Sequence, residues 1–276
     1  MNLNTSKVKV EKPEIKEEKP RKYILSKRLD RAFGELFNIY AFIVRFFKEA
    51  FMPPYEGREI VKQCYEIGVK SLPLVSLTGF IIGIVFTNQS RVSLAEFGGT
   101  SWLPALISVA IVRALAPLVT AIISAGKVGS QIGAELGSMK VTEQIDAMEV
   151  SASNPFRFLV VTRIFATTFM VPSLMMYMVF VALLGGYINV HQHELTSFTT
   201  YFIQVFNAVT FLDVFSSVIK SFLFGFTIGV VGCYKGYNSS KGTQGVGKAA
   251  NTSVVMAMFL IFIEELLSLQ IITALR

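Results

Sequence analysis

The sequence predicts an all-α, polytopic membrane protein with five transmembrane helices. Of its 276 residues, 52% are hydrophobic and only 16% are charged, whereas a soluble domain is about 25% charged. Apolar segments of roughly 20 residues, long enough to cross a ~30 Å hydrocarbon core, recur along the chain. Basic residues gather in the polar segments that join these helices on one side. Together these observations favour a membrane protein over a soluble domain.

The N-terminal region divides into two parts. Residues 1–22 are rich in Lys, Glu and Pro without periodicity, which predicts a disordered cytoplasmic tail. Residues 23–54 carry an amphipathic helical pattern. Its apolar positions are Leu29, Phe33, Leu36, Tyr40, Ile43, Phe47 and Phe51. Such a helix either lies in the membrane interface or packs on a soluble partner. Because membrane spans follow at once, the interface is favoured.

Residues 55–276 form the predicted transmembrane domain. The five predicted spans are Ser71–Thr87, Trp102–Ala125, Phe158–Gly186, Val214–Tyr234 and Ala249–Ala274. Pro172 lies inside the third span, which is long for one crossing and is expected to tilt or kink. The glycine pairs Gly79/Gly83 and Gly225/Gly229 allow close helix contact, and packing within one subunit is their favoured role.

The basic residues of the loops set the predicted orientation. They follow the second span (Lys127, Lys140, Arg157) and the fourth span (Lys235, Lys241, Lys248). The opposite loops contain only Arg91 among Lys and Arg, so the basic side is predicted to be cytoplasmic. The N-terminus is then inside and the C-terminus outside. The net charge of +7 fits an anionic leaflet, and no pattern typical of nucleic-acid binding is present.

A polar segment, residues 126–157, separates the second and third spans. Its apolar residues repeat at helical spacing, and carboxylates project between them, which predicts one helix or two short ones. Two interpretations remain open from the pattern alone. The segment is either gripped by a partner outside the membrane or is a structural hairpin that contacts nothing.

Two cations, Arg113 and Lys220, fall inside predicted spans. A charge at mid-membrane costs about 2.5–3.5 kcal/mol even on the lenient insertion scale, so it usually faces a cavity or a partner. Pro117 lies one turn after Arg113 and leaves a carbonyl nearby without its donor. The two cations either snorkel to the interface or line a pocket that binds lipid phosphate. Lys62 would add to that pocket from the cytoplasmic side.

Other candidate sites are weaker. The sequence Gly242–Ala249 is similar to a phosphate-binding loop, but it lacks the hydroxyl residue at the last position and a preceding strand. It is therefore interpreted as a turn before a helix. His191 and His193 have no evident third metal ligand, and two His more often face water. Glu264 and Glu265 lie toward the outer end of the last span and face either a cavity or a partner. No catalytic residue, metal site or cofactor is predicted.

Several of these segments resemble one family. Ala125–Ser130, Ala134–Glu149 and Asn154–Arg157 are similar to the signature of MlaE-type permeases, and the likeness includes Val218–Ser221 and Gly245–Lys248. These permeases are membrane subunits of bacterial ABC transporters that move phospholipids between the inner and outer membranes. The chain departs from the pattern at Arg113-Ala-Leu-Ala-Pro117, where the family has Arg-Glu-Leu-Gly-Pro. The carboxylate next to Arg113 is therefore missing, and an ion pair from that position is not expected.

The resemblance implies a specific role for the polar segment. It implies that the segment contains a coupling helix that docks on a cytoplasmic ABC ATPase. Its implied contact residues are Glu135, Met139, Glu143, Gln144 and Asp146. ATP hydrolysis would then occur on that separate chain, and this chain would not itself be an enzyme. Arg113, Lys220 and Lys62 are the candidate lipid-binding residues.

The resemblance also implies partners and a location. The expected assembly is a homodimer in the bacterial inner membrane, with two ATPase subunits and a periplasmic MCE-domain protein, with or without a small accessory subunit. It would serve outer-membrane lipid asymmetry. The alternatives are an ATP-independent secondary transporter of lipids or small molecules, which the charged segment disfavours, and a scaffold without transport, which the intramembrane cations disfavour.

Overall fold

The computed structural model describes residues 27–53, 56–151, 154–240 and 242–274. Every regular element in these ranges is a helix, which confirms the predicted fold class. The chain divides into two compact units, residues 1–41 and 42–276, and each is considered by itself. The predicted tail, residues 1–22, lies outside the described residues, as do the side chains of Leu29 and Leu36.

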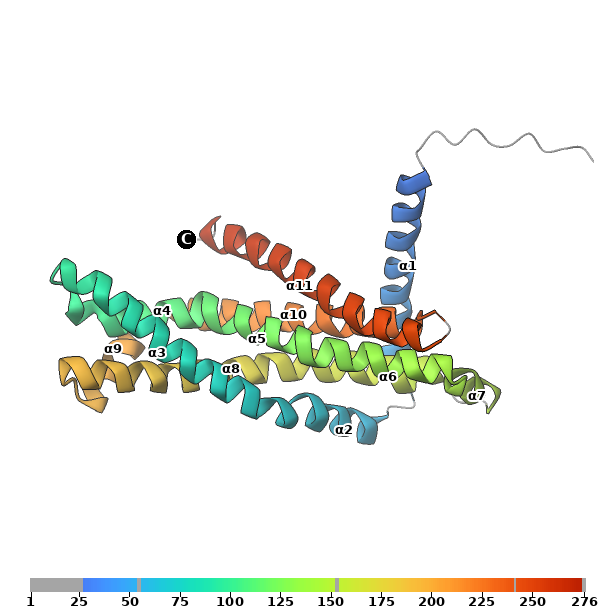
Figure 1. Ribbon diagram of the computed structural model, residues 1–276, viewed down its shortest axis with the longest axis horizontal. Helices are drawn as coiled ribbons and strands as arrows, with labels where there is room; N and C mark the ends of the chain where they lie inside the picture. The colour runs from blue at the N-terminus through green and yellow to red at the C-terminus, as the bar shows by residue number, and fades with distance from the viewer. Residues whose placement is uncertain (1–26, 54–55, 152–153, 241, 275–276) are drawn as a thin grey trace, which may run out of the picture. The chain divides into compact units, whose positions relative to one another are not determined.

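The elements follow one another along the chain (Figure 1). They are α1 (Lys27–Ala50), α2 (Gly57–Ile67), the 3-10 turn η1 (Val69–Ser71), α3 (Leu72–Glu96), the 3-10 turn η2 (Thr100–Trp102), α4 (Leu103–Ala110), the π-helical η3 (Ile111–Leu115), α5 (Ala116–Ser124), the π-helical η4 (Ala125–Gly129), α6 (Ser130–Val141), α7 (Gln144–Val150), the π-helical η5 (Phe156–Val161), α8 (Thr162–Glu194), α9 (Phe198–Ala208), α10 (Phe211–Tyr237) and α11 (Thr243–Ala274).

Five helical stretches are long and apolar enough to cross a membrane, as predicted. They are Gly57–Glu96, Thr100–Val141, Phe156–Glu194, Phe211–Tyr237 and Thr243–Ala274. Each predicted span lies inside one of them. The stretches are longer than the predictions because helical hydrogen bonding continues past the apolar core into polar residues at both ends.

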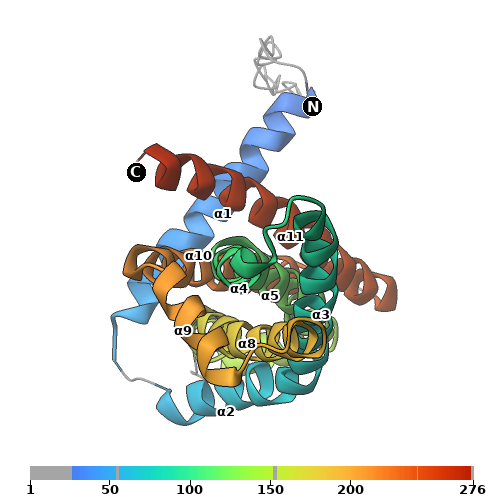
Figure 2. The ribbon, with the colours of Figure 1, turned by 90° about the vertical axis from the view of Figure 1, so that its left-hand side faces the viewer.

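Helix α8 is the centre of the second unit. It packs against α2, α3, α5 and α10, and the end view of Figure 2 shows it between α3, α9 and α2. Glycines permit this approach: a Cβ on Gly83 would lie 2.0 Å from the carbonyl oxygen of Ala182, and one on Gly225 would lie 2.5 Å from that of Thr167. Both glycine pairs thus serve packing within one chain, as expected.

The C-terminal part of α1 packs mainly through residues that the predicted apolar face did not include, although Ile43 of that face packs against the same apolar cluster. Phe42, Phe46 and Ala50 are buried, whereas Phe47 and Phe51 of the predicted face are 48% and 75% exposed. The ring of Phe42 makes edge contacts with Phe156 and Tyr234. Aromatic residues occupy two adjacent faces of this helix, so periodicity alone does not tell which one packs. The interfacial location stays a prediction.

The polar segment 126–157 contains two helices, one of the two expected arrangements, but less of it is exposed than the sequence pattern suggested. Its first part, η4 and α6, prolongs the helix of the second span and packs against α10 and α11, with Ile132 and Leu136 buried. The helix stops at Thr142, and Glu143 adopts a left-handed conformation (φ 59°) before α7 begins. Most side chains of residues 142–151, here called the tip, are exposed, with Ile145 buried. The exposed part is therefore shorter than the sequence pattern suggested.

Helix α9 was not predicted. It lies in the loop between the third and fourth spans, and Ser197 caps it by accepting a hydrogen bond from the amide of Thr200. Its Tyr201 and Val205 are buried in the same apolar cluster as Leu103 and Ile107 of α4. With 11 residues it is too short to register as a span. It forms part of the wall of the pocket described below.

Candidate functional site

The candidate site is built on a break in helical register in the second span. At η3 the amide of Ala116 donates to the carbonyl of Ile111, five residues back, which is the π-helical step. The carbonyl of Val112 therefore loses its α-helical donor. The carbonyl of Arg113 also lacks one, because the residue four positions on is Pro117, which has no N–H. Two adjacent carbonyls within a span thus require donors from another helix.

Helix α10 supplies both donors. Asp213, Ser217 and Lys220 are spaced by four and three residues and so share one face of α10. The hydroxyl of Ser217 donates to the carbonyl of Val112 at 2.7 Å. The Nζ of Lys220 donates to the carbonyl of Arg113 at 2.8 Å. The polar face of α10 therefore satisfies the two carbonyls that the π step and Pro117 leave open.

The side chain of Arg113 is held from the same face. Its Nε lies 2.7 Å from Oδ1 of Asp213, and its Nη2 donates to Oδ2 at 2.9 Å. The guanidinium and the carboxylate thus share one hydrogen bond and a second close ion-pair contact. Asp213 is also the third residue of α10 and closes a capping box, in which the amide and hydroxyl of Thr210 donate to Oδ2. The ion pair that was not expected from position 114 is supplied by α10 instead.

Lys220 is held by a carboxylate from the last span. Its Nζ lies 2.8 Å and 3.1 Å from the two carboxylate oxygens of Glu265. Together with the carbonyl of Arg113, these contacts occupy an ammonium group whose side chain is only 5% exposed. The neighbouring Glu264 accepts a hydrogen bond from the hydroxyl of Thr227. The polar chain from Asp213 to Glu265 thus ties the second, fourth and fifth spans together.

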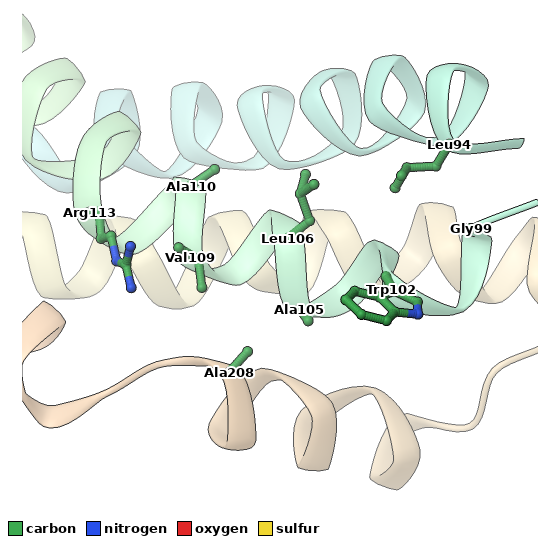
Figure 3. A pocket seen from close by; sticks show the side chains of 9 residues that line it. All are labelled: Leu94, Gly99, Trp102, Ala105, Leu106, Val109, Ala110, Arg113 and Ala208. Atoms are coloured by element: carbon green, nitrogen blue, oxygen red, sulfur yellow. The ribbon is translucent and has the colours of Figure 1, made fainter. Parts of the chain in front are cut away.

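An apolar pocket of about 630 Å³ adjoins Arg113. Its lining residues come from α3, α4, η3, α9 and the turns beside them: Leu94, Gly99, Trp102, Ala105, Leu106, Val109, Ala110, Arg113 and Ala208. Arg113 carries the only charge in this lining. Figure 3 shows Arg113 at one end of the pocket and Trp102 at the other. The side chain of Arg113 is 35% exposed, but its Nε is buried and the accessible surface of the pocket is apolar. The guanidinium therefore lies at the edge of the pocket, beside Asp213.

Lys62 lies apart from these two cations. It is on α2, which Figure 1 places toward the opposite end of the bundle from α4. Its side chain is 67% exposed, and Nζ lies 3.6 Å from a carboxylate oxygen of Glu59. The structure therefore brings Arg113 and Lys220 together but not Lys62. Asp213, Ser217 and Glu265 complete the cluster. Sequence reasoning gave Glu265 only as a weaker candidate and did not select Asp213 or Ser217.

The predicted coupling residues fall into two groups. Glu143, Gln144 and Asp146 are exposed at the tip, and Asp146 pairs with Lys140 at 2.7 Å. Glu135 and Met139 are half-buried on α6. Glu135 accepts from Gln131 and pairs with Arg163 of α8 at 3.1 Å. Only the first group is freely available to a partner.

Another charged contact ties the C-terminal part of α1 to the start of the third span. Glu49 accepts hydrogen bonds from Arg157 and Asn154, each at 2.9 Å. Burial alone would raise the pKa of Glu49, but the hydrogen bonds and the positive charge of Arg157 outweigh it and hold the pKa below its usual 4.5. The oxygen of Asn154 also caps the helix by accepting from the amide of Arg157, as its sequence position suggested.

The weaker candidates also have defined places. The ring nitrogens of His191 and His193 face main-chain oxygens of Thr196 and Asn189. Within the described residues no three His, Cys, Asp or Glu side chains are grouped to hold a metal ion. Gly242 adopts a positive φ of 94°, and α11 starts at Thr243, so the glycine-rich stretch is the turn that precedes a helix.

The fold and the site together define a multi-pass helical membrane protein that holds paired charges inside its spans beside an apolar pocket. Comparison with known proteins makes this specific. The family model described as Permease MlaE matches residues 60–271. The chain belongs to the MlaE permease family.

The similarity to individual proteins covers most of the chain. It is 34% identical over 233 residues to a probable ABC transporter permease protein of Rickettsia prowazekii, covering 84% of this chain and 89% of the relative. A protein of Synechocystis with the same description is 34% identical over 75% of this chain and 79% of its own. A third, from Pyropia yezoensis, is 32% identical over 75% and 78%.

Proposed function

We propose that this chain is the permease subunit of an ABC transporter and that its substrate is a phospholipid. Its family membership and the description of its relatives as probable ABC transporter permeases support the first part. The observation that supports the second part is the pocket, whose apolar wall ends at Arg113, the one charged residue of its lining. A phospholipid has the complementary chemistry, an anionic phosphate joined to apolar chains.

Arg113 is the proposed phosphate anchor. A guanidinium binds phosphate oxygens through two parallel N–H bonds, and the pocket volume of about 630 Å³ is within the range of small-molecule sites. Asp213 fixes the orientation of the guanidinium, and Lys220 adds positive charge close behind it. Lys62, exposed on α2, remains a proposed lipid contact at a separate place on the chain.

The tip is the proposed docking surface for a cytoplasmic ATPase subunit. Its Glu143, Gln144 and Asp146 are exposed, and α6 joins the tip directly to the helix that carries Arg113. A nucleotide-driven push on the tip would therefore reach the lipid pocket along one helical stretch. ATP hydrolysis belongs to the partner chain in this proposal.

The full assembly that we propose is a homodimer in the bacterial inner membrane, with a periplasmic MCE-domain protein that exchanges lipid with the pocket, with or without a small accessory subunit. The sparsely covered face of α11, with Val255, Phe259 and Phe262 exposed, supports contact with lipid or a second copy. The positive-inside pattern supports a cytoplasmic N-terminus and a periplasmic C-terminus.

Reconstitution tests the proposed function. The chain and its cognate ATPase would be placed in liposomes, and the transfer of a fluorescent phospholipid to acceptor vesicles would be followed. We expect transfer that requires ATP and does not respond to a proton or sodium gradient. Transfer by the chain alone, driven by such a gradient, would instead establish the ATP-independent secondary transporter.

A further inference from the structure

The contacts of Lys220 indicate that it stabilises the main chain of another helix. Its side chain is 5% exposed, and its Nζ lies within 3.1 Å of the carbonyl of Arg113 and of both carboxylate oxygens of Glu265. An ammonium group has three donors, and these three acceptors use them. A lipid phosphate would have to displace one of them. Arg113, in contrast, is 35% exposed and lines the pocket.

The carbonyl that Lys220 binds has a defined origin. Pro117 removes the N–H that would serve this carbonyl in an α-helix, and the π step of η3 diverts the amide of Ala116 to Ile111. Ser217 and Lys220 donate to the two carbonyls left open, at 2.7 Å and 2.8 Å. Without Lys220, the carbonyl of Arg113 would lack a donor in either helical register, because Pro117 has no N–H. The main chain at Arg113 would then be expected to shift, and the direction of its side chain would change with it.

We propose that Lys220 is a positioning residue: it fixes the main chain of η3 through the carbonyl of Arg113 and so holds the guanidinium of Arg113 at the edge of the pocket. Glu265 holds the charge of Lys220 in place, and Ser217 supports the adjacent carbonyl. Lys220 acts on the lipid through Arg113 and does not contact the phosphate. This inference rests on the proposed role of Arg113 in phospholipid binding.

The requirement for Lys220 depends on Pro117, and this permits a direct test. Pro117→Ala restores an N–H that can donate to the carbonyl of Arg113. The neutral pair Lys220→Met/Glu265→Gln removes the ammonium group without leaving its carboxylate charged. The pair would be introduced into the wild-type chain and into the Pro117→Ala background. Binding of a fluorescent phosphatidylglycerol to the full chain in detergent would be measured, with the diacylglycerol of the same acyl chains as the reference.

A positioning role predicts that the two changes are strongly coupled. We expect the neutral pair to weaken the preference for phosphatidylglycerol about tenfold in the wild-type chain. In the Pro117→Ala background the same pair should weaken it by less than about twofold. Equal losses in both backgrounds would overturn the inference, because a residue that binds phosphate directly cannot be replaced by a main-chain N–H.

A matched control uses the other polar contact between α10 and α11. Thr227→Val/Glu264→Gln removes the hydrogen bond between these two side chains, and its effect should be the same in both backgrounds. If the wild-type chain carrying the neutral Lys220 pair does not fold, the cycle is read from thermal midpoint and yield. Recovery by Pro117→Ala then supports the inference, and no recovery overturns it.

The outcomes separate this inference from the proposed function. If the unchanged chain does not prefer phosphatidylglycerol to diacylglycerol, the phosphate site itself fails and the inference fails with it. If the preference is present and the two changes are additive, the lipid site stands and only the positioning role of Lys220 is refuted.

Discussion

Arg113 is held at two points by one face of α10. Asp213 binds its guanidinium through two contacts, and Lys220 binds its main-chain carbonyl. Two contacts to the same residue restrict both the helical register and the side-chain direction. Pre-orientation of this kind lowers the entropy that an anionic ligand must lose when it binds.

The Arg113–Asp213 pair gives a prediction about stability. Arg113→Gln or Asp213→Asn alone should lower the free energy of unfolding by about 1–3 kcal/mol, because each leaves a charge without its partner in a poorly solvated place. The partial exposure of Arg113 keeps the value at the lower end. The double substitution should cost less than the sum of the singles. Thermal midpoints in detergent would check this, and an additive result would contradict the pairing.

Glu49 gives a prediction about pH. Its pKa is lowered in the folded chain, so the contact with Arg157 contributes stability that is complete above its usual pKa of 4.5 and is lost as the pH falls through the folded value. The thermal midpoint of Glu49→Gln should therefore lie below that of the wild type at pH 7. The two midpoints should converge at acid pH. A difference that persists or grows on acidification would exclude this assignment.

The sequence predicted which cations lie inside the spans, but it did not predict the carboxylates that pair with them. The cost of a charge in a span was enough to single out Arg113 and Lys220. Asp213 and Glu265 are 100 and 45 residues away from the cations that they bind, and no local spacing relates them. Pro117 signalled one open carbonyl, but the π step that opens the second depends on tertiary contacts from α10.

Close contact between helices fixes the positions of the spans relative to one another. Gly83 should not tolerate a side chain, since a Cβ there would lie 2.0 Å from a main-chain oxygen of α8. We predict that Gly83→Ala destabilises the chain by about 1–3 kcal/mol through overpacking. The control is Gly247→Ala in α11, where nothing lies within 4 Å of the new Cβ. That change should be neutral or stabilise by up to about 1 kcal/mol, and equal thermal shifts would contradict the account.

The tip gives a second prediction at the scale of elements. Glu143→Lys/Asp146→Lys should abolish ATP-dependent lipid transfer and reduce copurification of the ATPase, because it reverses the charge of the docking surface. Loss of the Lys140–Asp146 contact should matter little, as both side chains are exposed. Glu96→Lys/Glu194→Lys, an equal charge change at the exposed ends of α3 and α8, is the control and should leave copurification intact. Unchanged transfer in the tip variant would refute the docking role.

The spans themselves were largely predictable, because about 20 successive apolar residues indicate a membrane-spanning helix. The residues at which the helices end were harder to predict. The second span continues to Val141 because α6 packs on α10 and α11, so only the tip of the polar segment is left exposed. Helix α9 was not predicted, because the sequence of a short helix rich in aromatic residues is hard to distinguish from that of a loop.

At the scale of the whole molecule, the polar chain from Asp213 to Glu265 joins the second, fourth and fifth spans, and the second span also carries the tip. Movement of the tip would therefore act on helices that are already tied together around Arg113. We expect the pocket to widen or narrow as these helices move, which would admit or release a lipid.

The central claim is that Arg113 recognises the phosphate of a bound lipid. The most direct measurement compares the binding of phosphatidylglycerol and of diacylglycerol with the same acyl chains, for the full wild-type chain and for Arg113→Gln. The wild type should bind the phospholipid at least about tenfold more tightly than the diacylglycerol, and Arg113→Gln should bind the two alike. A preference that survives in Arg113→Gln, or that is absent from the wild type, would contradict the account.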